Sequence, residues 1–182
     1  MTGPIYTIVQ KSDSWLMRAI GTFLKVVSFG QNTTFMTDFV TTINHTIYVP
    51  TAYSIWRQET RDAVIEHEKV HIAQADKYTF LFFAFLYVCM FFPIGLAYFR
   101  MKFEQEAYAV TLKCYYASYG AAYIQLPEVK ASMVSYFTGP SYLWTWPFKK
   151  SIETWYDATV QGILASAVAP NKPSTGGLTI EC

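Results

Sequence analysis

The stretch AVIEHEKVHIAQADK, residues 63–77, decides how this chain folds and what it can do. It places His67 and His71, two of the three histidines in the chain, four residues apart around Glu68. Apolar and polar residues recur through residues 54–76 with the spacing of an amphipathic helix. On a helix, a separation of four residues puts both imidazoles on one face, one turn apart. The stretch therefore predicts a helix that directs two imidazoles to one point.

Two imidazoles in this arrangement are typical of a zinc site. Both rings can reach one ion at Zn–N distances of about 2.0–2.1 Å. Glu68 is offset by one residue, so it can reach a bound water and act as a general base toward a carbonyl substrate. The alternative is that His67 and His71 are ordinary surface or core histidines. The helical context, in a chain with so few histidines, favours metal binding.

A catalytic zinc needs a third protein ligand and an open position. The best candidates lie in FEQEAYA, residues 103–109, where Glu104 and Glu106 are expected to open a second long helix over 100–123. They are two residues apart, so they point in different directions and only one can face the metal. The alternative for Glu106 is a solvated charged turn. His45, in a predicted turn, is a third candidate.

The pair of motifs HEKVHIAQ, residues 67–74, and FEQEAYA resembles the gluzincin metallopeptidases, especially minimal ones of bacteria and their phages. In related membrane-linked peptidases the second motif runs Glu-x-Glu-Ala-Asp, and its first glutamate binds zinc. The resemblance covers roughly residues 40–112 and implies Glu104 as the third ligand. Tyr108 stands where the family has aspartate, so the usual carboxylate partner of a zinc-binding histidine is missing.

A β-hairpin is predicted before the HExxH helix. Residues 33–50 are rich in Thr, Val, Ile, Phe and Tyr, which favours strands, with a turn at Asn44-His45 and an end at Pro50. In peptidases that resemble this chain, such an edge strand pairs with an extended peptide; the alternative is a scaffold hairpin. Further helices are predicted over 12–30, capped by Ser12 or Ser14 and ended by Gly30, and near 128–137 and 148–166.

Residues 78–99 form an apolar run without a charged residue, long enough to cross a bilayer. A single span would separate His71 from Glu104 by about 30 Å, and the two could not share a zinc ion. We therefore favour a helical hairpin that returns near Pro93 and Gly95, buried or facing a partner, over insertion into a membrane.

A second aromatic segment, FTGPSYLWTWPF at residues 137–148, suits the wall of a cleft. Within it, Tyr142 is the candidate donor of a hydrogen bond to the oxyanion of the reaction. The alternative is that these aromatic side chains pack in the core or at an interface.

Composition limits the range of partners. Hydrophobic residues make up 52% of the chain and charged residues only 15%, which leaves apolar surface for a membrane, a partner chain or a large assembly. The net charge of +1 argues against nucleic acid. Cys89, Cys114 and Cys182 form no disulfide framework, and the N-terminus has no secretory signal pattern. We expect a reducing compartment or a virion rather than secretion.

The sequence thus predicts a mostly α (α+β) fold. Residues 1–168 would form one metallopeptidase-like domain and residues 169–182 a tail. The predicted function is zinc-dependent hydrolysis of a peptide or protein, with Zn²⁺ on His67, His71 and Glu104. Two alternatives stay open: a structural subunit of a large assembly, such as a phage particle, with a vestigial or structural zinc site, and a small membrane protein with an accidental HExxH.

Overall fold

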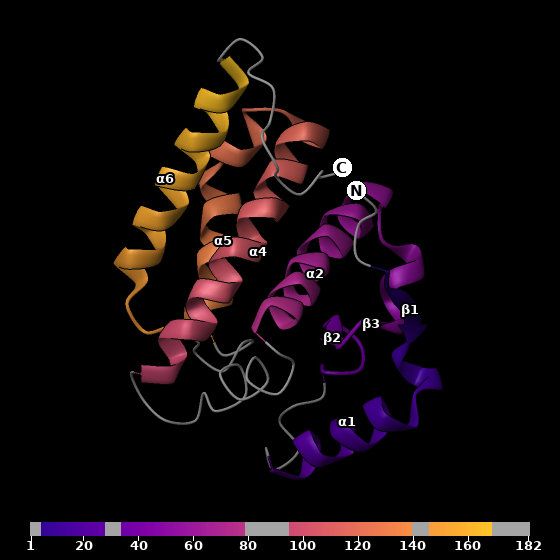
Figure 1. The fold of residues 1–182 in the computed structure, drawn as a ribbon. Coiled ribbons are helices and arrows are strands. Elements are labelled where there is room, and N and C mark those ends of the chain that lie inside the picture. Colours follow the sequence, from indigo (N-terminus) through magenta and orange to yellow (C-terminus); the bar gives the residue numbers. More distant parts are fainter. Residues whose placement is uncertain (1–4, 28–33, 79–94, 140–145, 169–182) are drawn as a thin grey trace.

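A computed structural model describes residues 5–27, 34–78, 95–139 and 146–168 of the chain. These residues form a mostly helical fold with one small three-stranded sheet (Figure 1). The predicted mostly α (α+β) class is confirmed. Tyr142, most of the apolar run 78–99 and the tail 169–182 lie outside the described residues.

The sheet has the strand order β1-β3-β2, formed by β1 (Thr7–Gln10), β2 (Thr41–Ile43) and β3 (Thr46–Val49). β2 and β3 form the predicted antiparallel hairpin, and Asn44 at its turn has a φ of 54°, a conformation that asparagine tolerates in two-residue turns. β1 was not predicted. It pairs in parallel with β3, a contact between distant parts of the chain that no local pattern reveals.

The first part of 33–50 is not a strand, contrary to the prediction from its composition. Residues 35–38 form a turn, in which the backbone N–H groups of Thr37 and Asp38 donate to the carbonyl of Thr34. Local hydrogen bonding by threonine and aspartate segments competes with strand pairing here.

α1 (Trp15–Val27) confirms the first predicted helix. Ser14 is its cap, since its Oγ accepts a hydrogen bond from the Met17 N–H at 3.3 Å. Met17 is buried, whereas Trp15, Phe23 and Val26 are 73%, 64% and 69% exposed. α1 therefore presents apolar side chains on its outer face. In Figure 1 the helix lies below the sheet.

The remaining helices follow the predicted order. A short 3₁₀ turn (Thr51–Ile55) precedes α2 (Gln58–Tyr78); α4 (Gly95–Tyr119), a 3₁₀ turn (Tyr123–Gln125), α5 (Pro127–Thr138) and α6 (Lys149–Val168) come later. Gly120, with a φ of 81°, ends α4 as expected. α4 already includes Gly95, so Glu104 and Glu106 lie inside the helix and do not open it as predicted. The prediction differs because the helix begins at Gly95 rather than near residue 100.

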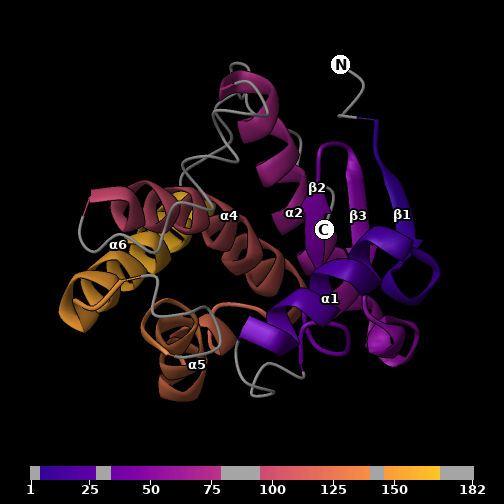
Figure 2. The same cartoon turned by 90° about the horizontal axis from the view of Figure 1, so that it is seen from below.

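Two hydrophobic cores flank the α2–α4 pair. One joins the sheet to α2 through Ile47, Val49, Ile65 and Ile72. The other holds α4, α5 and α6 together around residues such as Leu112, Phe137 and Ile152. Figure 2 shows α4, α5 and α6 on one side of α2 and the sheet on the other. The contact between α2 and α4 therefore has a packed core on each side.

One cysteine forms a bond that the sequence did not reveal. Cys114 is buried and disulfide-bonded, a bond that the sequence analysis, which found no disulfide framework, did not predict. The odd, widely spaced cysteine count gave no sign of it.

Among the described helices, none has both the length and the apolar character needed to span a bilayer.

Candidate metal centre

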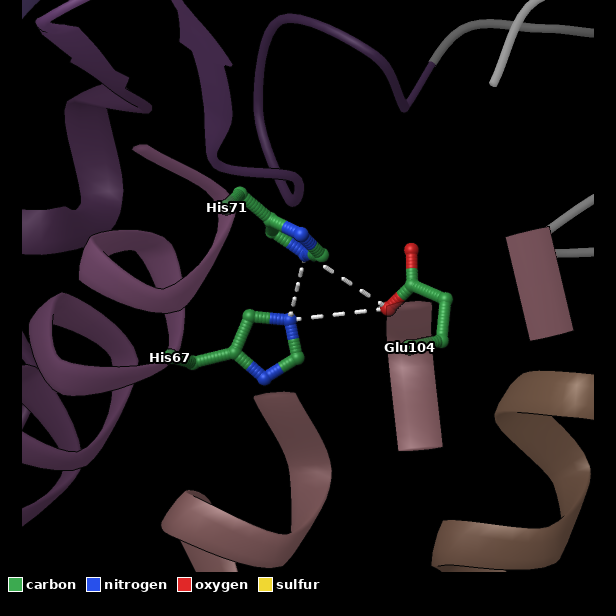
Figure 3. A group of neighbouring side chains, drawn as sticks. All are labelled: His67, His71 and Glu104. Atoms are coloured by element: carbon green, nitrogen blue, oxygen red, sulfur yellow. Dashed lines mark hydrogen bonds and ion pairs between the residues drawn. The ribbon is translucent and has the colours of Figure 1, made fainter. Parts of the chain in front are cut away.

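His67 and His71 from α2 meet Glu104 from α4 in the interior of the molecule (Figure 3). The two Nε2 atoms lie 3.2 Å apart. Oε2 of Glu104 lies 3.5 Å from Nε2 of His67 and 3.8 Å from Nε2 of His71. All three side chains are buried, with Glu104 only 2% exposed. The structure thus brings together the three residues that the two motifs single out.

The spacing of these three atoms fits a metal ion. Ligand atoms around a tetrahedral zinc ion, with bonds of about 2.0–2.1 Å, lie about 3.3 Å apart. A point equidistant from the three observed atoms lies about 2.0 Å from each of them, which is the length of such a bond. The group can hold a metal ion without any rearrangement of the helices.

The hydrogen bonds of Gln74 fix the orientation of His71. The Gln74 amide nitrogen donates to the Phe103 carbonyl at 3.2 Å and to the Glu106 carboxylate at 2.8 Å. Its oxygen therefore faces Nδ1 of His71, at 2.9 Å, and accepts a hydrogen bond from the Nδ1–H group. With Nδ1 protonated, neutral His71 presents the lone pair of Nε2 to the centre.

Thr111 performs the same role for His67. Its hydroxyl donates to the Ala107 carbonyl at 3.4 Å, so its oxygen accepts from Nδ1 of His67 at 3.2 Å. The ring of Tyr108 packs edge-on against His67 with centroids 4.5 Å apart. Thr111 thus supplies the hydrogen-bonding partner of His67.

Two imidazole nitrogens and one carboxylate oxygen converge here, so a proton on a histidine or a bound cation would relieve the repulsion between their electron pairs. Burial alone would lower the pKa of His67, but its hydrogen bond with Glu104 and the charge of Glu68 raise it. Burial would likewise raise the pKa of Glu104, yet the hydrogen bond with His67 and the charge of His71 hold it at about 2. A proton or a metal ion can supply the missing charge, and the two compete.

Glu68 lies beside this centre and faces a cavity. It is 8% exposed, and with His67 it forms part of the wall of a cavity of about 750 Å³. Its Oε2 accepts a hydrogen bond of 2.7 Å from the hydroxyl of Thr42 in β2. The sheet therefore orients the carboxylate that would serve as general base.

The other sequence candidates lie elsewhere. Nε2 of His45 is 3.2 Å from Asp76, and both side chains are largely exposed. Glu106 is bound to Gln74 and supports His71 indirectly. Sequence reasoning missed Gln74, Thr111 and Thr42. Spacing offered a signal for Thr111, because seven residues after Glu104 a helix presents the same face.

Comparison with known proteins adds no relative: no family model, curated protein or solved structure matches the chain. The likeness to gluzincins therefore rests on the residues themselves.

Proposed function

We propose that this protein is a zinc-dependent peptidase. The observation that carries the proposal is the convergence of two histidine nitrogens and one carboxylate oxygen beside a cavity whose wall includes Glu68. Two imidazoles and one glutamate are a common ligand set of catalytic zinc, which keeps a fourth position open. The buried setting and the two histidine supports favour a preorganised site over an accidental cluster.

In this proposal the chain's own residues divide the work. A zinc ion held by His67, His71 and Glu104 would polarise the scissile carbonyl and acidify the attacking water. Glu68 takes a proton from that water as the water oxygen bonds to the carbonyl carbon. Glu68 then delivers the proton to the amide nitrogen as the C–N bond breaks. Thr42 keeps the Glu68 carboxylate in position during both transfers.

β2 is suited to bind the substrate backbone. It is an outer strand of the sheet, and the residues just before it, Phe39 and Val40, belong to the cavity wall. An extended peptide that pairs with an outer strand places alternate side chains into neighbouring pockets. The strand that orients Glu68 would thus also align the bond to be cut.

A cleavage screen tests the proposal. Zinc-loaded protein is incubated with a mixed peptide library, and new termini are identified by mass spectrometry. We expect cleavage that is abolished by a chelator, restored by zinc and reduced at least about a hundredfold in Glu68→Gln. Glu66→Gln, a glutamate on the same helix that binds Lys69, is the control. Activity in Glu68→Gln equal to the control would contradict the proposed mechanism.

One observation favours a second candidate function, a structural subunit of a larger assembly with a structural zinc site. The outer face of α1 exposes Trp15, Phe23 and Val26, apolar side chains that an assembly would cover. For this candidate, light scattering should show particles larger than a monomer, and Phe23→Glu should reduce them to monomers. A monomeric wild-type protein that cleaves peptides would exclude it.

A further inference from the structure

The cavity beside Glu68 has the size of a binding site. Its volume of about 750 Å³ lies in the range of roughly 300–1,000 Å³ for ligand pockets, and it exceeds the volume of a single side chain. Residues from α2, α4, α5 and the segment before β2 enclose it. These elements include parts of the chain outside the two sequence motifs. The lining of the cavity therefore indicates which side chains of a ligand can bind, which the metal centre alone does not.

Aromatic rings form a large part of the wall. They belong to Phe39, Trp56, Tyr108, Tyr115, Tyr123 and Tyr136. The rings of Tyr108 and Tyr136 stack with centroids 5.5 Å apart, and Tyr115 meets Tyr123 edge-on at 5.6 Å. Burial, together with the neighbouring tyrosines, raises the pKa of Tyr115 to about 12. Such a wall favours a bulky apolar or aromatic group.

The charged side chains of the wall are mainly acidic. Apart from His67, its ionisable side chains other than tyrosine are Asp38, Glu68 and Glu128. Within the described part of the chain, neither lysine nor arginine contributes to this wall. Asp38 and Glu128 are exposed, and Glu128 lies in the first turn of α5. The charge of a bound dication would be met by Glu104 and Glu68, which leaves Asp38 and Glu128 as the charges of the cavity mouth.

We propose that the cavity binds a peptide segment with a bulky apolar or aromatic side chain whose flanking residues are basic or neutral, and that it rejects acidic segments. The aromatic wall takes the side chain, and the carboxylates of Asp38 and Glu128 attract flanking lysine or arginine residues. The inference rests on the proposed peptidase function, because it specifies the substrate of the same site.

Peptide binding to the intact chain tests the charge preference. The protein is zinc-loaded Glu68→Gln, which should bind without turnover. The probes are two fluorescent eight-residue peptides with a central Phe-Leu pair, one flanked by lysines and its twin flanked by glutamates. At low salt we expect the lysine peptide to bind about tenfold more tightly, an advantage that salt should reduce. Equal affinities, or tighter binding of the glutamate twin, would overturn the charge preference.

Two matched pairs of variants test whether the cavity is responsible. Glu128→Lys should remove most of the preference, whereas Glu153→Lys on α6, outside the cavity, should keep it. Ser132→Trp should fill the cavity and weaken both peptides at least tenfold, whereas Ser135→Trp, another exposed serine of α5, should not. Unchanged binding in Glu128→Lys and Ser132→Trp would overturn the inference.

Failure of the inference and failure of the proposed function can be told apart. If wild-type protein cleaves peptides with no regard to flanking charge or to Ser132→Trp, the peptidase function stands and the inference falls. If the lysine peptide binds as expected but wild-type, zinc-loaded protein leaves it intact, the cavity preference stands and the peptidase function falls.

Discussion

Oγ1 of Thr111 lies 3.2 Å from Nδ1 of His67. Thr111 belongs to α4, the helix that also holds Glu104, and it follows Glu104 by about two turns. One helix therefore supplies both the carboxylate of the metal centre and the support of one histidine. The partner of His67 is a hydroxyl rather than a carboxylate. Because it is neutral, it orients the imidazole without adding a negative charge to the centre.

We predict that Thr111→Val weakens zinc binding by about tenfold or more. Valine keeps the shape of threonine but cannot accept a hydrogen bond from Nδ1–H of His67, and loss of such a support typically costs 10–100-fold in metal affinity. Titration against a chromogenic chelator measures the effect. Thr159→Val is the control, because Thr159 also bonds a carbonyl one turn back, in α6. Equal zinc affinities for the two variants would show that Thr111 has no such role.

Thr42 should act as a positioning residue for Glu68. Removing its 2.7 Å hydrogen bond in Thr42→Val leaves a buried carboxylate less well oriented, and we predict a fall in kcat of about tenfold with little change in KM. Thr42→Ser should restore kcat, and Thr41→Val, the neighbouring threonine of β2, should leave it unchanged. A rise in KM alone would instead indicate a role in substrate binding.

Lys11 provides a pH-dependent contribution to stability. Its side chain is fully buried, donates to the Phe35 carbonyl at 2.7 Å and lies 3.8 Å from the centroid of the Phe35 ring. Burial lowers the pKa of Lys11 from 10.5 to about 8, against the opposing charge of Glu68. Between these two values the unfolded chain binds more protons than the folded one, so the free energy of unfolding should rise with pH.

We predict a rise of up to about 1.4 kcal/mol per pH unit above pH 8 from this single group. Lys11→Met should remove it. Urea unfolding from about pH 8 to 9.5 measures the slope, below the region where tyrosines titrate. Tyr115 and Tyr156, whose pKa values burial raises to about 12, act in the opposite direction above about pH 10. An identical slope in wild type and Lys11→Met would refute this account of Lys11.

Local patterns predicted the parts of this fold that local interactions determine. The HExxH helix follows from its periodicity, the hairpin from Asn44-His45, and the end of α4 from Gly120. β1 depends on pairing with β3, and Cys114 on a distant sulfur, so no local pattern revealed them. In the site, the four-residue spacing predicted that His67 and His71 meet, and the resemblance of FEQEAYA to the gluzincin motif indicated Glu104 beside them. Thr42 and Gln74 escaped prediction, because hydrogen-bonding partners depend on how α2 meets the sheet and α4.

The most direct test of the central claim is the zinc affinity of Glu104→Ala beside that of Glu106→Ala, with wild type as reference and circular dichroism to confirm folding. We predict about one zinc per wild-type chain, a loss of at least about a hundredfold in Glu104→Ala, and a loss of no more than about tenfold in Glu106→Ala, which removes only a contact of Gln74. Wild-type affinity in folded Glu104→Ala, or no zinc in the wild type, would contradict the metal centre.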